Sequence, residues 1–553
     1  MAELKFIGGY PEYMRKLIDV VNKTRPQRKD YTPKAMSMAE REEVLKLCHP
    51  DYAPGGKRQL LFGPNAGDLA PNEVVDLIEA HPLIDPEQFT ITNPDYAVDL
   101  LIIGGGLAGT AAALLANDNG VKAENILLVN KLRHGDSNSM MAEGGTQAAD
   151  RENDSPLIHY IDTIGGGHFA NKPEVVEALV NDAPFVMEWL CNLGAMLDRN
   201  PDGSFVEKAF GGGSRLRMHA CKDYTGLEEL RVLRDEFRCR QIPYIEFYPV
   251  IEFLTDGNRV TGAILYNLET GDYKIVQAKA IILATGGFGR LHIRGFPTTN
   301  HYGATADGIV LAYRVGAKLR DTDTVQYHPT GAAYPQQIIG LLLTEKLRGM
   351  GAQPINIDGE AFVYPLEPRD VEAASFIKEC YVNDKGIVTP TGMRGVWLDT
   401  PLIDLKNGPG TIEKAFPGML RLYKRFDIDI RKDPVLVFPT LHYQNGGVET
   451  DPWGRTNIEG LWVAGEVSGG VHGKNRLMGN STLDCLVFGR RAGISTAEYL
   501  KSNPQFGKLT LEHLKKYKKM MAEAGINTTR KAPILFPEYR GKAVLARKID
   551  IFR

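Results

Sequence analysis

The stretch AVDLLIIGGGLAGTAAALLAND, residues 97–118, decides the fold class of this 553-residue chain. An apolar run precedes Gly104, Gly106 and Gly109 in the spacing GxGxxG, and an alanine-rich run follows them. The first glycine permits a tight turn, the second lets the backbone approach a pyrophosphate, and the third lets the helix pack close to the sheet. The helix N-terminus then binds the phosphates. The pattern predicts a Rossmann-like dinucleotide-binding domain of the α/β class.

Three more apolar runs predict strands, and they lie far apart: ILLVNK (126–131), AKAIILATGG (278–287) and LWVAGEV (461–467). We therefore predict a discontinuous domain at 96–325 and 441–492 with an inserted domain between. For the C-terminal segment, 493–553, the sequence predicts one helix over 509–525 and then an irregular tail.

Residues 1–95 form an N-terminal extension of different character. Helices are expected at Glu12–Asn22 and Met38–Leu47, and the second begins with a Ser37/Glu40 capping box. Two interpretations stay open. The extension is either an arm that wraps the main body or a docking surface for another subunit.

Composition excludes several classes of function. The net charge of −3 creates no field that attracts nucleic acid or an anionic membrane. No apolar run reaches the roughly 18 residues of a membrane span, so we expect no direct membrane insertion. The six cysteines form no CxxC pair, so we expect no iron–sulfur cluster and no metal ligands, and sparse thiols indicate a cytoplasmic protein.

A second group of residues favours a flavin. The loop SNSMMAEGGTQAA (137–149) offers hydroxyls, an amide and paired glycines, as expected of a loop against a flat ring. Asn130 stands where a ribose-binding acid is usual, which weakens an NAD assignment without excluding FAD. With the three fingerprint glycines, the predicted cofactor contacts are Asn130, Lys131, Ser137, Asn138, Ser139, Gly144, Gly145, Thr285, Gly286, Asp307, Glu466 and Ser481.

Later segments combine histidine, arginine, threonine and glutamate with glycine turns: VQYHPTG (325–331), LLLTEKLRGMG (341–351), EPRD (367–370), LHYQNGG (441–447) and VHGKNRLMGNS (471–481). Arginine binds a carboxylate through two parallel hydrogen bonds, and histidine adds a donor. The set therefore predicts a small dicarboxylate substrate.

In this order, the segments resemble the flavoprotein subunit of the fumarate reductase/succinate dehydrogenase family over about 96–492, and AGEVSGGVHGKNRL is most similar to its soluble fumarate reductases. The resemblance implies a Rossmann-like FAD domain with an inserted α+β capping domain at 326–440. It also implies that electrons reach the flavin from an iron–sulfur partner.

The resemblance also implies residue roles. His442 and Arg476 would bind one substrate carboxylate, and His328 and Thr344 the other. Arg369 would donate the proton, with Glu345 and Arg348 relaying protons to it, while hydride comes from flavin N5. His472 is a further candidate for flavin contact.

One position departs from the respiratory members. They usually attach FAD through a histidine five residues before the glutamate that is Glu143 here, and this chain has Asn138. We therefore expect non-covalent FAD and fumarate reduction as the working direction. L-aspartate oxidase, a reductase of another unsaturated acid and a non-catalytic electron relay remain alternatives.

Overall fold

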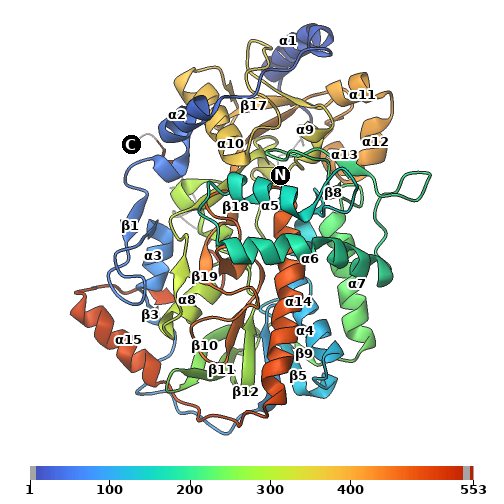
Figure 1. Cartoon of the computed structure of the whole chain (residues 1–553). Helices are drawn as coiled ribbons and strands as arrows, with labels where there is room; N and C mark the ends of the chain where they lie inside the picture. Colours follow the sequence, from blue (N-terminus) through green and yellow to red (C-terminus); the bar gives the residue numbers. More distant parts are fainter. Residues whose placement is uncertain (1–7, 540–548, 552–553) are drawn as a thin grey trace, which may run out of the picture.

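A seven-stranded sheet forms the base of the computed structural model, which describes residues 8–539 and 549–551 (Figure 1). Its strand order is β10-β11-β12-β4-β5-β9, and β20 pairs with β12. The strands are β4 (Tyr96–Ile103), β5 (Ile126–Val129), β9 (Tyr244–Ile245), β10 (Val250–Asp256), β11 (Arg259–Tyr266), β12 (Tyr273–Leu283) and β20 (Leu461–Val463). All four strands predicted from the sequence therefore lie in one sheet.

The long strand β12 organises this sheet. It pairs in parallel with β4 on one side. On its other side, its first half pairs with antiparallel β11 and its second half with parallel β20, where Ile281 lies opposite Leu461. Because β20 (from Leu461) begins 178 residues after the end of β12 (Leu283), the chain returns to this sheet after it has built a separate layer.

Helices cover the sheet, and α14 (Asn480–Lys501) packs along α4 (Leu107–Asp118). Two glycines of α14 permit this close approach, since a Cβ on Gly489 or Gly493 would lie 2.4 Å from a backbone oxygen of α4. Nearby helices are α5 (Pro156–Gly166), α6 (Pro173–Asn192), α7 (Thr225–Cys239) and α8 (Asp307–Arg314).

A second, antiparallel sheet lies above the first in Figure 1, in the order β14-β18-β17-β15 with β16 paired to β17. Its strands are β14 (Val325–Ala332), β15 (Gln353–Ile355), β16 (Ile387–Val388), β17 (Arg394–Asp399) and β18 (Val435–Gln444). The helices of this region are α9 (Lys346–Gly349), α10 (Arg369–Ile377), α11 (Leu402–Asn407), α12 (Thr411–Ala415) and α13 (Pro417–Lys424). We propose that this layer is the capping domain.

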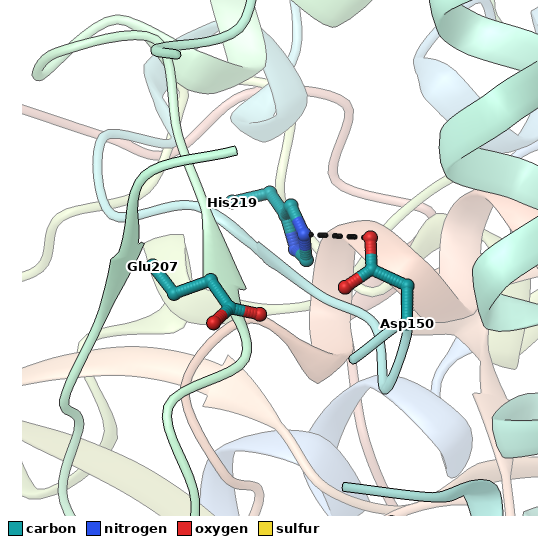
Figure 2. Close-up of side chains that lie close together, drawn as sticks. All are labelled: Asp150, Glu207 and His219. Carbon is teal, nitrogen blue, oxygen red and sulfur yellow. Dashed lines mark hydrogen bonds and ion pairs between the residues drawn. The ribbon is translucent and has the colours of Figure 1, made fainter. Parts of the chain in front are cut away.

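Two three-stranded sheets complete the body. One is β13 (Leu319–Arg320), β19 (Gly447–Glu449) and β21 (Ser468–Gly469). The other has the order β6-β8-β7, with β6 (Thr146–Gln147), β7 (Glu207–Lys208) and β8 (Met218–His219). Figure 2 shows three polar side chains gathered at the β6-β8-β7 sheet.

The N-terminal extension runs down one side of the molecule in Figure 1. It contains α1 (Glu12–Arg28), α2 (Met38–Cys48), β1 (Lys57–Gln59), β2 (Leu69–Pro71), α3 (Asn72–Ile78) and β3 (His81–Pro82). The capping box of α2 is present, with the Ser37 and Glu40 side chains each bonding the other residue's backbone N–H. Helix α1 continues six residues beyond the predicted end at Asn22. Pro26 does not stop the helix, because it lies in the last turn, where the missing N–H costs few hydrogen bonds.

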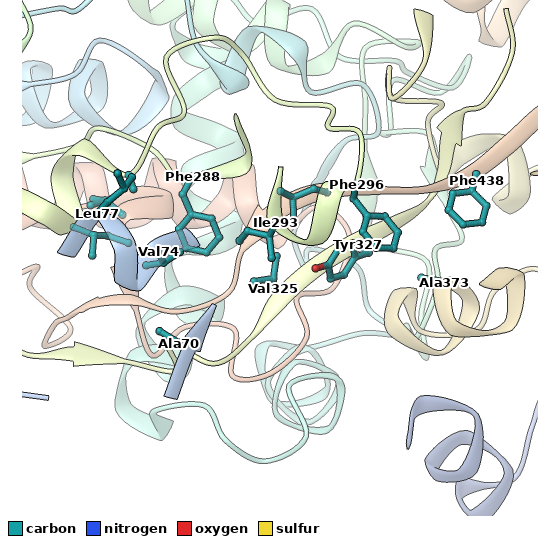
Figure 3. Packing of buried hydrophobic residues seen from close by; sticks show 14 of the residues in the cluster. Ala70, Val74, Leu77, Phe288, Ile293, Phe296, Val325, Tyr327, Ala373 and Phe438 are labelled. Carbon is teal, nitrogen blue, oxygen red and sulfur yellow. The ribbon is translucent and has the colours of Figure 1, made fainter. Parts of the chain in front are cut away.

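The apolar face of the extension packs on the chain itself. Ala70, Val74 and Leu77 lie in one buried cluster with Phe288 and with residues of β14 and β18 (Figure 3). Hydrophobic burial of this kind contributes about 25 cal/mol per Å². The described part of the extension therefore packs on the body, and a role as a docking surface for another subunit stays a prediction.

The C-terminal segment begins with a continuation of α14, since that helix runs unbroken through residue 492 to Lys501. The helix predicted over 509–525 is α15 (Glu512–Glu523), and β22 (Lys531–Ala532) then pairs in parallel with β3 of the extension. Within the described residues, none of the helices combines the length and apolar character that crossing a bilayer requires.

Candidate active site

The fingerprint glycines form the turn between β4 and α4. Gly104 has a φ of +109°, and a Cβ there would lie 2.2 Å from the oxygen of Ala284. A Cβ on Gly109 would lie 1.8 Å from the oxygen of Gly104, so this glycine lets α4 pack against the turn. Gly109 does not line the cavity described below, which agrees with a packing role.

One cavity joins the glycine turn to the arginine-rich segments. It is lined by every predicted cofactor contact except Gly109 and the further candidate His472, and by every predicted substrate or proton-transfer residue except Arg348. Residues as far apart in the sequence as Gly104 and Ser481 therefore meet at one site. Gly104 and Gly106 come first along the sequence among these predicted lining residues, and Arg476 and Ser481 come last.

Several residues that line this cavity carry a buried polar atom without a protein partner. They include Asn130 Nδ2, Thr285 Oγ1 and Glu143 Oε2. A buried polar atom without a hydrogen bond costs free energy, so such atoms in a cavity indicate a polar ligand. Together with the glycine turn, these residues fit the hydroxyls, phosphates and ring edge of FAD.

Two predicted cofactor contacts pair with each other. The Lys131 ammonium forms an ion pair with Asp307, and it also donates to Thr305 Oγ1 at 2.8 Å. Thr305 in turn donates to Asp307 Oδ1 at 2.8 Å. The pair neutralises two charges beside the cavity while leaving both side chains at its wall.

Asn138 lies at the wall where the family's flavin-linking histidine is expected. Its amide donates to Asn300 Oδ1 at 3.0 Å and to Glu466 Oε2 at 3.2 Å, and its oxygen accepts the His301 N–H at 2.7 Å. Burial raises the pKa of Glu466 to about 7, despite the donors that favour its charged form. Because three bonds hold the Asn138 amide, its orientation is fixed.

At the arginine end of the cavity, Arg369 begins α10 and bonds a carboxylate. Its Nε donates to Glu345 Oε2 at 2.7 Å. Arg348 lies on the far side of Glu345, with 3.3 Å between Nη2 and Oε2, and also pairs with Glu372. Burial alone would raise the pKa of Glu345, but these two guanidinium groups outweigh burial and lower it.

Sequence reasoning missed Gln326, which joins the two arginines of the cavity. Its Oε1 accepts from Arg369 Nη1 at 3.0 Å and from Arg476 Nη2 at 2.8 Å. The strand periodicity of two contained the signal, since Gln326 and His328 lie on the same face of β14. The bridge holds two cationic side chains side by side.

Arg476 is buried without a carboxylate. Its remaining bonds go to Ser481 Oγ at 3.0 Å and to a backbone oxygen, and its guanidinium lies 4.4 Å from the centre of the Tyr443 ring. Within the described residues, no aspartate or glutamate lies within 4.0 Å of it. Burial, together with Arg369, lowers the pKa of Arg476 to about 9.

His328 and His442 face each other in the same cavity, with ring centres 5.0 Å apart. Burial and the nearby arginines hold the pKa of both imidazoles well below the ordinary value, so both rings are neutral at pH 7. His442 Nδ1 and Thr299 Oγ1 are 2.7 Å apart, which fixes one ring. Thr344 lines the cavity as well.

His472 does not line this cavity. It is buried beside Tyr443, and its Nε2 lies 3.4 Å from Asp484 Oδ2. Its contact with the flavin stays a prediction.

The family model described as an FAD binding domain matches residues 99–482. A fumarate reductase (CoM/CoB) subunit of Methanothermobacter marburgensis is 38% identical over 419 residues, which are 74% of each chain. This chain belongs to the fumarate reductase and succinate dehydrogenase flavoprotein family. It is thus an FAD-dependent oxidoreductase.

Among solved structures, a FrdA chain of Escherichia coli quinol fumarate reductase is similar to this family member. The TM-score is 0.69 at 32% identity, covering 77% of this chain and 74% of that one. The predicted α/β FAD-binding fold with a capping domain is therefore confirmed. An L-aspartate oxidase of Streptomyces coelicolor is 34% identical over 416 residues, 72% of this chain and 68% of that protein.

Proposed function

We propose that this flavoprotein reduces fumarate to succinate. The observation that carries the proposal is the buried Arg476, which has no carboxylate partner, beside Arg369, which has one. An unpaired buried charge is costly, so the Arg476 site favours an anionic ligand. Arg369 is already paired with the Glu345 carboxylate, and this pairing suits a role in proton transfer better than a role in binding an anion.

The neutral imidazoles extend this site to a doubly charged substrate. Arg476 and His442 would bind one carboxylate, while His328 and Thr344 would bind the other through hydrogen bonds. Reduced FAD, when bound, supplies the hydride to the alkene. A substrate held at both ends by fixed groups would be oriented for that transfer.

Arg369 would protonate the adjacent carbon. Burial lowers the pKa of Arg369, although the Glu345 carboxylate raises it again. Glu345, 2.7 Å from Arg369 Nε, would return the proton, and Arg348 would continue the relay away from the cavity. One hydride and one proton convert the double bond to a single bond, which balances the reduction.

An Arg369→Gln variant tests this role. We expect fumarate turnover, driven by a reduced dye under anaerobic conditions, to fall by about 10²–10⁴-fold because the acid is lost. FAD content should not change. The matched control is Arg421→Gln, since Arg421 is exposed on α13. Turnover by Arg369→Gln within threefold of the parent would contradict the proposed role.

L-aspartate oxidation is the second candidate, and the 34% identical relative of that name favours it. Aspartate added without oxygen would bleach the flavin of an aspartate oxidase. We expect no bleaching by aspartate and rapid reoxidation of the reduced flavin by fumarate. The opposite pair of results would replace the first proposal by the second.

We further propose that FAD is bound without a covalent bond, because an amide at Asn138 offers no nucleophile comparable to an imidazole. Acid precipitation of the yellow protein should leave the flavin in the supernatant. Colour that stays with the pellet would disprove this prediction. Absorbance at about 450 nm in each fraction gives the measurement.

Electrons would come from an iron–sulfur subunit, and we propose a cytoplasmic complex. Six cysteines without CxxC spacing leave this chain without its own cluster motif. Relatives named as subunits support a partner. The unbroken set of site residues argues against a silent electron relay.

A further inference from the structure

Three potential metal ligands meet outside the cavity, at the small sheet β6-β8-β7 (Figure 2). Glu207 on β7 lies opposite His219 on β8, and β6 pairs with the other edge of β8. Asp150 follows β6 by three residues. Each residue places one ligand atom within 4.8 Å of the other two. None of the three lines the cavity described above.

The hydrogen bonds of His219 determine which ring nitrogen faces the two carboxylates. Its Nδ1 lies 3.1 Å from the backbone oxygen of Arg217, which can only accept, so Nδ1 carries the hydrogen. Nε2 is therefore the nitrogen that faces the carboxylates, and it shares a hydrogen bond with Asp150 Oδ2 at 3.0 Å, a contact that a bound ion would replace. Metal-binding histidines use this arrangement, in which a backbone carbonyl fixes the tautomer and the ring orientation.

Burial and packing hold the ring in this orientation. The His219 side chain is fully buried, and the Phe205 ring packs edge-on against it with centres 4.8 Å apart. The facing Glu207 Oε1 is buried and forms no hydrogen bond. His219 Nε2, a Glu207 oxygen and an Asp150 oxygen therefore converge within 4.8 Å of one another, on a position that a cation would complete.

Nearby positive charge does not fill this position. Arg151 Nε lies 3.4 Å from Glu207 Oε1, without a hydrogen bond to that oxygen. The Arg217 guanidinium is paired with Asp154 and with another aspartate, at 2.7 and 2.6 Å. The two carboxylates of the cluster therefore outnumber the one guanidinium beside them, that of Arg151.

We propose that Asp150, Glu207 and His219 bind one divalent transition-metal ion of the Mn²⁺ or Zn²⁺ class. Imidazole with two carboxylates suits these ions better than Mg²⁺ or Ca²⁺, which prefer oxygen ligands alone. The ion would fasten the hairpin between β7 and β8 to the segment after β6. This assignment departs from the expectation of no metal ligands, which rested on sequence motifs.

The position gives the ion a structural consequence. The same hairpin carries Gly211, whose N–H donates to Glu345 Oε1 at 2.6 Å. Met218, the residue before His219, packs closely on two glycines of the cavity wall. A Cβ on Gly145 or on Gly479 would lie 2.7 Å from the Met218 side chain. A bound ion would therefore hold a segment that contacts the cavity wall.

Titration of the full-length, FAD-loaded protein with Mn²⁺ tests the proposal, after treatment with a chelator. Free Mn²⁺ is counted by its electron paramagnetic resonance signal. We expect one Mn²⁺ per chain, displaced by Zn²⁺ because Zn²⁺ binds such ligands more tightly. Mn²⁺ should also raise the thermal midpoint, because it binds the folded chain.

Asp150→Asn is the main variant, since its partly exposed side chain makes misfolding a small risk. We expect at least a tenfold loss of Mn²⁺ affinity and no rise in the thermal midpoint. His219→Gln should lose the site as well. Asp202→Asn, on the turn before β7, is the matched control and should bind as the parent does. No saturable Mn²⁺ binding, or binding unchanged in Asp150→Asn, would overturn the proposal.

Discussion

Gln326 shows how one neutral side chain sets the electrostatics of the cavity. Two guanidinium groups repel, yet both Arg369 and Arg476 donate to the same Gln326 oxygen. The Gln326 amide nitrogen is held in turn by Asn475 Oδ1 at 3.1 Å and by the Arg476 backbone oxygen at 2.7 Å. Gln326 is therefore a positioning residue, since it acts through the arginines.

Gln326→Leu should lower kcat/KM for fumarate by about 10–100-fold, because each buried donor left without an acceptor costs about 1–3 kcal/mol. FAD content should not change. The matched control is Gln353→Leu, since that buried amide bonds Tyr31 far from the cavity. If both variants lose activity equally, the loss reflects stability and the positioning role is wrong.

At the scale of elements, the approach of α4 to the glycine turn decides whether the cofactor site forms. Gly109 lies in the first turn of α4, where nothing larger fits beside the Gly104 oxygen. Gly165 of α5 is the contrasting case, because a Cβ there meets no atom within 4 Å. An alanine at Gly109 therefore tests close packing, whereas an alanine at Gly165 tests helix propensity alone.

Gly109→Ala should push α4 from the sheet, with a loss of about 1–3 kcal/mol in the free energy of unfolding. The FAD content of the purified protein should fall with it. Gly165→Ala, as the control, should keep its FAD and gain stability, because alanine favours the helix by up to about 1 kcal/mol. Full FAD occupancy in Gly109→Ala would refute the packing argument.

At the scale of the whole molecule, the N-terminal extension reaches from the proposed cap to helix α8 and strand β13 of the body. Arg25 and Arg28 of α1 both pair with Asp399 at the end of β17, at 2.7 and 2.8 Å. Farther along, Tyr313 of α8 donates to the Phe62 oxygen, and Asn65 donates to the Leu319 oxygen at 2.8 Å. The extension therefore contacts both the proposed cap and the body.

Asp399→Asn should lower the free energy of unfolding by about 3–5 kcal/mol, because it leaves two largely buried arginines without a charged partner. Urea denaturation measures the change. Asp384→Asn removes an exposed pair with Arg394 in the same layer and should change stability little. Equal stability of the two variants would show that the extension is not anchored through Asp399.

The sequence determined by itself what depends on near neighbours: the glycine turn of 104–109, the capping box of Ser37 and Glu40, and the apolar strands. Such features follow from backbone geometry and local hydrogen bonds. The family motifs also indicated the side chains of the cavity. Only the tertiary structure decided that Gln326 bridges two arginines, that Asp150, Glu207 and His219 meet, and that α14 continues past residue 492. The two groupings depend on packing between distant segments: a local pattern can place Gln326 on a strand face, but it does not name the arginines that meet there.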